Sequence, residues 1–117
     1  IILCDPVLLQ QAFYEVLKNA IDAMEFCNKK ILTIEITREY NSLRVSIRDT
    51  GVGIPDTELD RIYNPMYSSK PTGRNWGLGL TLAYQIITAH NGIIKVLSTV
   101  NFGTEVIINL PIRDYEY

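Results

Sequence analysis

The sequence predicts an α+β domain in which helices cover one face of a mixed, mainly antiparallel sheet. Three observations predict this two-layer α/β sandwich. Two segments carry apolar residues at helical spacing, two pairs of segments alternate apolar and polar residues, and a short turn separates the members of each pair. At 117 residues, the chain is expected to form a single domain, residues 1–117, with one hydrophobic core.

Composition and charge narrow the class of function. With 11 basic and 13 acidic residues the formal net charge is -2, so charge alone attracts neither nucleic acid nor an anionic membrane. No apolar run in the sequence reaches the length of a membrane span, and the first residues are not expected to be a signal peptide. Cys4 and Cys27 are interpreted as free thiols in a reducing compartment. Residues 1–3 are interpreted as part of a strand, and we expect this chain to be a fragment of a longer protein.

A first helix is predicted to begin after Asp5 and to run to about Phe26. Asp5 is a typical capping residue, and Pro6 has the fixed φ that suits the first helical position. Apolar residues then recur three or four positions apart and form one broad arc: Leu9, Ala12, Phe13, Val16, Leu17, Ala20 and Met24. This arc is expected to face the core.

Three polar residues, Glu15, Asn19 and Asp22, lie together on one shoulder of this arc, because residues three or four apart share a helix face. For Asp22 the ordinary interpretation is a solvated helix edge. Asn19 lies beside the core, where a weak helix former in mid-helix is unusual. Its side-chain oxygen is a suitable ligand for a hard cation such as Mg²⁺.

Residues 31–38 and 43–49 alternate apolar and polar side chains, which predicts an antiparallel hairpin. The same alternation places Asp49 on the apolar face at the end of the second strand, directly before Gly51 and Gly53. A carboxylate aimed inward needs a hydrogen-bond donor. Two interpretations are open: Asp49 caps the turn through the nearby backbone, or it binds a polar ligand at the rim of a pocket.

Residues 51–76 show no sustained period apart from a short helix at 56–63. A connection of this length in a compact domain is usually a functional loop or a disordered one. We interpret it as a lid, with a mobile surface loop as the alternative.

A second helix is predicted at 77–90, followed by strands at 93–99 and 104–110. Gly77 and Gly79 stand at its entrance, where free N–H groups and the helix dipole favour phosphate. A helix also begins with glycine without any ligand, so this signal alone is weak. His90, in the last turn, is interpreted as a capping residue.

Four motifs in this order resemble those of the ATP-binding domain of sensor histidine kinases, in the GHKL ATPase superfamily. Residues 15–20 (EVLKNA) resemble its N box, 49–53 (DTGVG) its G1 box, 62–70 (IYNPMYSSK) its F box and 77–80 (GLGL) its G2 box. Residues 101–104 (NFGT) resemble the last glycine-containing turn. The resemblance covers nearly the whole chain and implies the Bergerat ATP-binding fold with an ATP lid.

The resemblance implies a role at each matching position. Asp49 would accept a hydrogen bond from the adenine amino group. Gly51 and Gly53 would let the loop pass close to the base. Asn19 would ligate a Mg²⁺ ion that bridges the phosphates, and would thereby take part in catalysis.

The remaining positions would, by this resemblance, lie near the phosphates of ATP. Gly77, Leu78 and Gly79 would bind the nucleotide, with the two glycines presenting backbone N–H groups. Lys70 would reach the phosphates from the lid, a solvated lysine being the alternative. Glu15 matches the acidic position that acts as general base in the ATPase relatives, with a supporting polar role as the alternative.

The implied reaction transfers the ATP γ-phosphoryl group to a histidine on a separate helical dimerisation domain. In the two-component phosphorelay, the group then passes to an aspartate of a response regulator. His90 does not lie on such a helical dimerisation domain, so we do not interpret it as the acceptor. The parent is expected to be a homodimer, cytoplasmic or anchored in the cell membrane. This fragment is expected to be monomeric and to bind no nucleic acid.

The chain departs from the family pattern at the G2 box and the N box. Asn75, followed by Trp76, stands where a further glycine is usual, and Asp22 stands where many relatives carry a basic residue. Because Asp22 is acidic, a contact from this position to a phosphate is not available. The alternative functions are another GHKL ATPase, an anti-sigma-factor serine kinase, and a degenerate nucleotide-binding interaction module.

Overall fold

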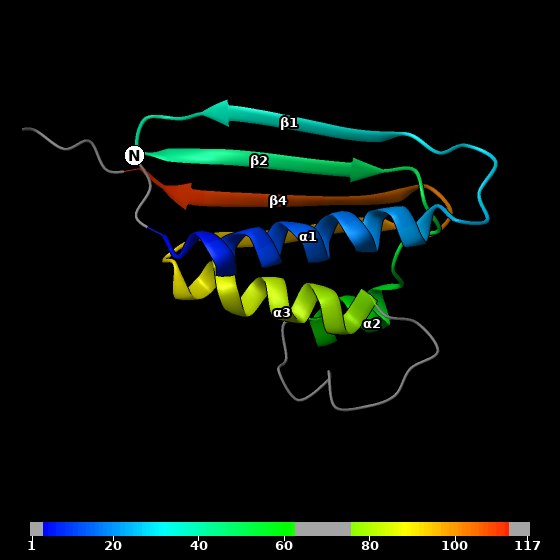
Figure 1. Cartoon of the computed structure of the whole chain (residues 1–117). Helices are drawn as coiled ribbons and strands as arrows, with labels where there is room; N and C mark the ends of the chain where they lie inside the picture. The colour runs from blue at the N-terminus through cyan, green and yellow to red at the C-terminus, as the bar shows by residue number, and fades with distance from the viewer. Residues whose placement is uncertain (1–3, 63–75, 113–117) are drawn as a thin grey trace, which may run out of the picture.

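The computed structural model describes residues 4–62 and 76–112, except for the side chains of residues 60–62 and 76–78. The strand expected at 1–3, most of the F box with Lys70, and Asn75 lie outside the described residues. The described elements are three helices on one side of a four-stranded sheet (Figure 1). This arrangement confirms the two-layer α/β sandwich.

The sheet has the strand order β1-β2-β4-β3. Its strands are β1 (Leu32–Arg38), β2 (Ser42–Asp49), β3 (Ile93–Thr99) and β4 (Gly103–Pro111). All pairings among these strands are antiparallel. The parallel pairing expected of a mixed sheet is therefore not among the described strands. The four strands begin and end within one residue of the predicted positions.

Helix α1 (Pro6–Ala23) begins as predicted but ends earlier than expected. The Asp5 carboxylate accepts hydrogen bonds from the N–H groups of Val7 and Leu8 at 3.0 and 3.2 Å, which caps the helix. At the other end, the carbonyl oxygen of Ala23 accepts a bond from the N–H of Val52 at 3.0 Å. The helix was predicted to reach about Phe26; it ends at Ala23 because that carbonyl bonds to the loop after β2.

Helices α2 (Asp56–Ile62) and α3 (Trp76–Ala89) lie close to the predicted ranges. His90 joins the end of α3 to the start of α1: its Nδ1 lies 2.8 Å from the Ile86 carbonyl, and its Nε2 accepts from the Asp5 N–H at 2.9 Å. Asn91 has a φ of 61°, the left-handed conformation expected at the end of this helix. The capping interpretation of His90 agrees with these contacts.

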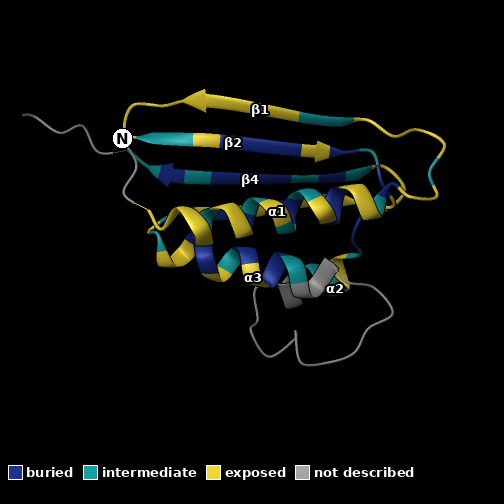
Figure 2. Ribbon diagram, in the orientation of Figure 1, coloured by how far each residue is buried: buried dark blue, intermediate teal, exposed yellow. Residues whose placement is uncertain are grey.

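The core lies between the sheet and the helices α1 and α3 (Figure 2). Its buried side chains come from both helices, from three strands and from the loop after β2: Ala12, Val16, Val45, Ile47, Ile54, Leu80, Ala83, Ile86, Ile87, Ile94, Val96, Val106, Ile108 and Leu110. Small residues of α1 and α3 let the two helices pack side by side.

Strand β1 is less covered than its pattern predicted. Ile34 and Ile36 lie on the helix side of the sheet, yet 49% and 66% of their surface is exposed. The reason is that β1 lies at the edge of the sheet (Figure 2), while α1 packs over β2 and β4 and α3 packs over β3. Across residues 4–62 and 76–112, no helix combines the length and the apolar character that crossing a membrane requires.

Candidate nucleotide-binding site

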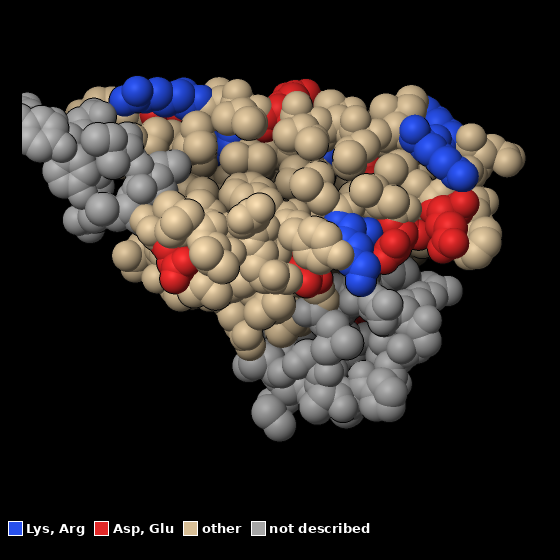
Figure 3. All heavy atoms as spheres, in the orientation of Figure 1, with Lys and Arg blue, Asp and Glu red and all other residues tan. Residues whose placement is uncertain are grey.

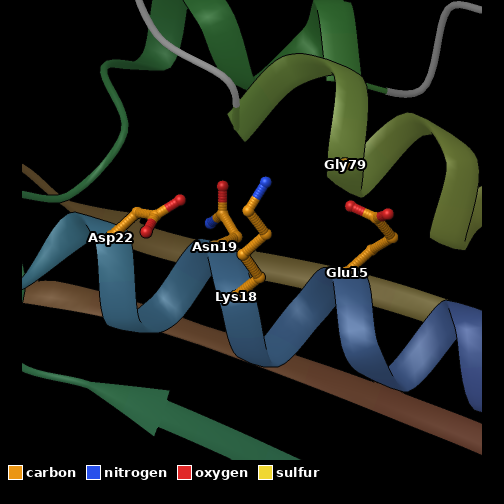
Figure 4. A pocket seen from close by; sticks show the side chains of 5 residues that line it. All are labelled: Glu15, Lys18, Asn19, Asp22 and Gly79. Carbon is orange, nitrogen blue, oxygen red and sulfur yellow. The ribbon is translucent and has the colours of Figure 1, made fainter.

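A small hollow opens between α1 and the first turn of α3. It is lined by Glu15, Lys18, Asn19, Asp22 and Gly79 (Figure 4). The four α1 residues reach one hollow because their spacing of three or four positions places them along one face of the helix. The structure therefore brings three of the predicted site residues together: Glu15, Asn19 and Gly79.

Gly79 lets the two helices approach at this point. A Cβ atom at Gly79 would lie 3.0 Å from Oε2 of Glu15. The other oxygen, Oε1, accepts a hydrogen bond at 2.8 Å from Nε2 of Gln11, one turn earlier on α1. The Glu15 carboxylate is thus held beneath the start of α3, where backbone N–H groups are free of helical partners.

Asn19 is the buried polar residue of this hollow, with 8% of its surface exposed. Figure 4 shows its side chain pointing from α1 towards α3, with the Lys18 side chain directed the same way and the Asp22 carboxylate beside it. Asp22 is exposed, as the solvated-edge interpretation predicted, yet it also lines the hollow. On the face drawn in Figure 3, acidic and basic side chains lie next to each other over the C-terminal half of α1.

Asp49 is buried at the end of β2, with 7% of its surface exposed. Its Oδ1 accepts a hydrogen bond from the N–H of Gly51 at 2.8 Å. Burial raises the pKa of the Asp49 carboxyl above its ordinary value, and hydrogen bonding from the backbone of Gly51 and Thr104 opposes this rise. Asp49 therefore does cap its own turn, as the first interpretation held, and this contact occupies only one of its oxygens.

Gly51 and Gly53 allow the loop after β2 to lie against the protein backbone. A Cβ atom at Gly51 would lie 2.6 Å from the carbonyl oxygen of Ala23. Gly53 has a φ of 77°, and a Cβ atom there would lie 2.3 Å from the carbonyl oxygen of Thr99. Both glycines are required by close approaches within the chain, whatever they contact in a ligand.

The loop connects the two groups of site residues. Among the described residues, Asp49, Gly51 and Gly53 do not line the hollow that holds Asn19. However, Gly51 packs against Ala23, which lies one helical turn after Asn19 on the same face of α1. Four residues of helix span about 6 Å, so the Asp49 loop and Asn19 occupy neighbouring turns.

The other predicted positions are described in part. Gly77, Leu78 and Gly79 belong to the first turn of α3, and of these three only Gly79 is described in its contacts. Lys70 lies outside the described residues, so its predicted place near the phosphates stays a prediction. Across residues 4–62 and 76–112, no three His, Cys, Asp or Glu residues gather into a metal-binding group.

Two features of the site were missed in the sequence. Lys18 lines the hollow, and its position three residues after Glu15 was the available signal. Thr104 is buried and pairs with Asp49 in the register of β2 and β4. No local sequence pattern reveals that pairing, because it joins segments far apart in the chain.

Comparison with known proteins now identifies the class. Residues 4–114 match the family described as "Histidine kinase-, DNA gyrase B-, and HSP90-like ATPase". The chain belongs to this family. Within it, the chain is homologous to the catalytic domains of sensor histidine kinases, as the following relatives and structures show.

The most informative curated relatives are bacterial kinases. The chain is 38% identical over 112 residues to sporulation kinase E of Bacillus subtilis (strain 168), covering 96% of this chain and 15% of that kinase. It is 36% identical over 107 residues to sporulation kinase B of the same organism, covering 92% of this chain and 24% of the kinase. The chain thus spans less than a quarter of these two proteins.

Solved structures agree with the sequence relatives. A nucleotide-free form of the catalytic domain of histidine kinase ThkA superposes with a TM-score of 0.77 at 27% identity, covering 94% of this chain and 71% of that one. The mycobacterial sensor histidine kinase MprB gives a TM-score of 0.77 at 25% identity, covering 97% and 76%. The fold is that of a histidine kinase catalytic domain.

The raised pKa of Asp49 predicts a pH dependence of stability. The folded chain keeps the Asp49 proton to higher pH than the unfolded chain, whose ordinary pKa is 3.8. The free energy of unfolding of the wild type should therefore fall, relative to Asp49→Asn, as pH rises from 3.8 through the raised value, and the difference should then stay constant. Urea unfolding of both proteins over the acid range measures this; a difference that grows in favour of the wild type with pH would contradict it.

Proposed function

We propose that this chain binds ATP with Mg²⁺ and is the phosphoryl-donating domain of a two-component sensor histidine kinase. The observation that carries the proposal is that two buried polar side chains, those of Asn19 and Asp49, lie near neighbouring turns of α1. Asn19 faces the glycine-lined start of α3, and Asp49 lies at the end of β2, just before the loop that packs on the next turn of α1.

Asp49 is proposed to recognise the base. Oδ1 accepts from the Gly51 N–H, and an ionised carboxylate has about four acceptor positions, so it can also accept from the adenine amino group. A buried carboxylate is suited to this task because burial strengthens its hydrogen bonds. A ligand without a matching donor would leave the carboxylate unpaired, which costs binding free energy. The close packing of Gly51 and Gly53 supports base recognition by holding the loop in one conformation.

Asn19 is proposed to act at the phosphates through Mg²⁺. An amide oxygen is a donor that Mg²⁺ accepts, and this cation usually binds one or two protein oxygens together with phosphates and water. The hollow around Asn19 fits that requirement, since it also holds the oxygens of Glu15 and Asp22. When bound, Mg²⁺ would neutralise charge on the phosphates.

The start of α3 is proposed to hold the phosphate groups. Gly77, Leu78 and Gly79 lie in its first turn, where N–H groups lack helical acceptors and the helix dipole favours anions. The Lys18 side chain, which points towards this turn, adds a positive charge (Figure 4). Lys70 of the lid is a further candidate for the same role.

Glu15 is proposed to support the reaction by position. Gln11 donates to it and Gly79 packs against it, so the carboxylate stays below the phosphate end of the site. The reaction breaks the bond between the γ-phosphorus and its bridging oxygen and forms a bond to a histidine nitrogen, releasing ADP. Positioning and charge neutralisation supply most of the catalysis in such transfers.

The acceptor histidine is proposed to lie on a helical dimerisation domain elsewhere in the parent protein. A response regulator would then receive the phosphoryl group on an aspartate. We propose a cytoplasmic location for the domain, a homodimeric parent and a monomeric isolated chain. The support is the homology to sensor kinases, of whose length this chain spans a small part.

Asp49→Asn should weaken ATP binding about ten- to hundredfold, because a charge-assisted hydrogen bond to the base is lost while the Gly51 contact keeps an acceptor. Calorimetric titration with ATP and Mg²⁺ measures the affinity. Glu35→Gln, which removes a carboxylate from the exposed edge strand β1, is the matched control and should bind as the wild type does. Equal ATP affinity of Asp49→Asn and the wild type would refute base recognition by Asp49.

Asn19→Ala should remove the Mg²⁺ dependence of nucleotide binding, since the proposed amide ligand is gone. The ratio of ADP affinities with and without Mg²⁺ should fall towards one, measured by the same titration. Asn28→Ala, at an exposed position after α1, serves as the control and should keep the wild-type ratio. A wild-type ratio in Asn19→Ala would exclude Asn19 as a ligand.

A further inference from the structure

The hydroxyl of Ser98, near the end of β3, joins two other segments of the chain. Its Oγ accepts a hydrogen bond from the N–H of Ile54 at 2.7 Å. The same atom lies 3.0 Å from the Gly103 carbonyl oxygen, to which it donates, and 2.7 Å from Oγ1 of Thr104. One side chain thus connects the loop after β2 with the first two residues of β4.

These three bonds use the full capacity of a serine hydroxyl, which has one donor and two acceptor sites. Because the Ser98 proton goes to the Gly103 carbonyl, the Thr104 hydroxyl donates to Ser98, as does the Ile54 N–H. Ile54 and Thr104 are both buried, so water is a poor replacement for either bond. One further hydrogen bond, from the Asn101 N–H to the Val52 carbonyl oxygen at 2.8 Å, joins the same loop to the turn between β3 and β4.

The segments that meet at Ser98 are those that surround Asp49. Thr104 pairs with Asp49 in the sheet, and its backbone bonds to the Asp49 carboxylate. Gly103 lies so close that a Cβ atom there would be 2.1 Å from the Asp49 carbonyl oxygen. Ile54 follows Gly53, which packs on Thr99, the residue after Ser98.

We propose that Ser98 is a positioning residue for base recognition, holding the loop at residues 50–54 and the start of β4 on either side of the Asp49 carboxylate. The inference rests on the proposed function, in which Asp49 binds adenine. Ser98 acts at the base end alone, because the Asn19 hollow is formed by α1 and α3. Loss of the hydroxyl therefore weakens binding of the base and leaves the Mg²⁺ effect intact.

The chain offers a matched control in Ser46. This serine, too, lies on a strand; it is buried and donates a hydrogen bond to Oε2 of Glu105 at 2.6 Å. Its neighbours Val45 and Ile47 face the helices, so Ser46 lies on the opposite face of the sheet. Ser46→Ala thus removes a hydroxyl and its bond to Glu105 on the opposite face of the sheet, and it leaves the bonds of Ser98 to Ile54, Gly103 and Thr104 in place.

The test compares Ser98→Ala, Ser98→Thr, Ser46→Ala and Asp49→Asn by titration with ADP, with and without Mg²⁺. Ser98→Ala should bind ADP about tenfold more weakly, with an unchanged Mg²⁺ ratio, and Ser98→Thr should restore binding because it keeps the hydroxyl. Ser46→Ala should bind as the wild type does. In ¹⁵N–¹H spectra, the Gly51 amide should shift in Ser98→Ala and not in Ser46→Ala.

The outcomes separate the two proposals. Wild-type affinity in Ser98→Ala together with lost binding in Asp49→Asn would overturn the role of Ser98 and leave the proposed function standing. Wild-type affinity in both variants would overturn the proposed function and the role of Ser98 with it. If Ser98→Ala does not fold, Ser98→Cys replaces the hydroxyl by a weakly hydrogen-bonding group of similar size, and the same affinities decide.

Discussion

The contact between the loop after β2 and the last turn of α1 determines how this domain is built. The Ala23 carbonyl accepts the Val52 N–H, and Gly51 lies against the same carbonyl at a distance that no side chain would permit. This contact ends the helix, sets the path of the loop and places Asp49 next to the face of α1 that carries Asn19. In the proposed function, helix and sheet thereby contribute to one nucleotide site.

The polar residues of the site are costly to bury, which explains why so many backbone groups surround them. A buried carboxylate is disfavoured in its charged form, and the raised pKa of Asp49 reflects this cost. The N–H of Gly51 and the backbone of Thr104 offset part of it, and Ser98 holds both sides of that arrangement. Perturbed pKa values of this kind are common at functional sites.

The sequence predicted the helices and the strands, because hydrophobic periodicity and capping residues are local signals, and three of its predicted site residues, Glu15, Asn19 and Gly79, line one hollow. It failed where tertiary contacts decide. The end of α1 depends on Val52, and the exposure of Ile34 and Ile36 depends on which strands the helices cover. The roles of Ser98 and Thr104 were missed because their partners lie on other strands and loops, so no spacing within one segment indicates them.

One measurement tests directly whether Asp49, Asn19 and the start of α3 form a single nucleotide site. The ¹⁵N-labelled chain is titrated with ADP and Mg²⁺, and its amide signals are followed. The backbone amides of Gly51 and Gly79 and the side-chain amide of Asn19 should shift together in one saturable transition. Binding that shifts other signals and leaves these three unchanged would contradict a shared site.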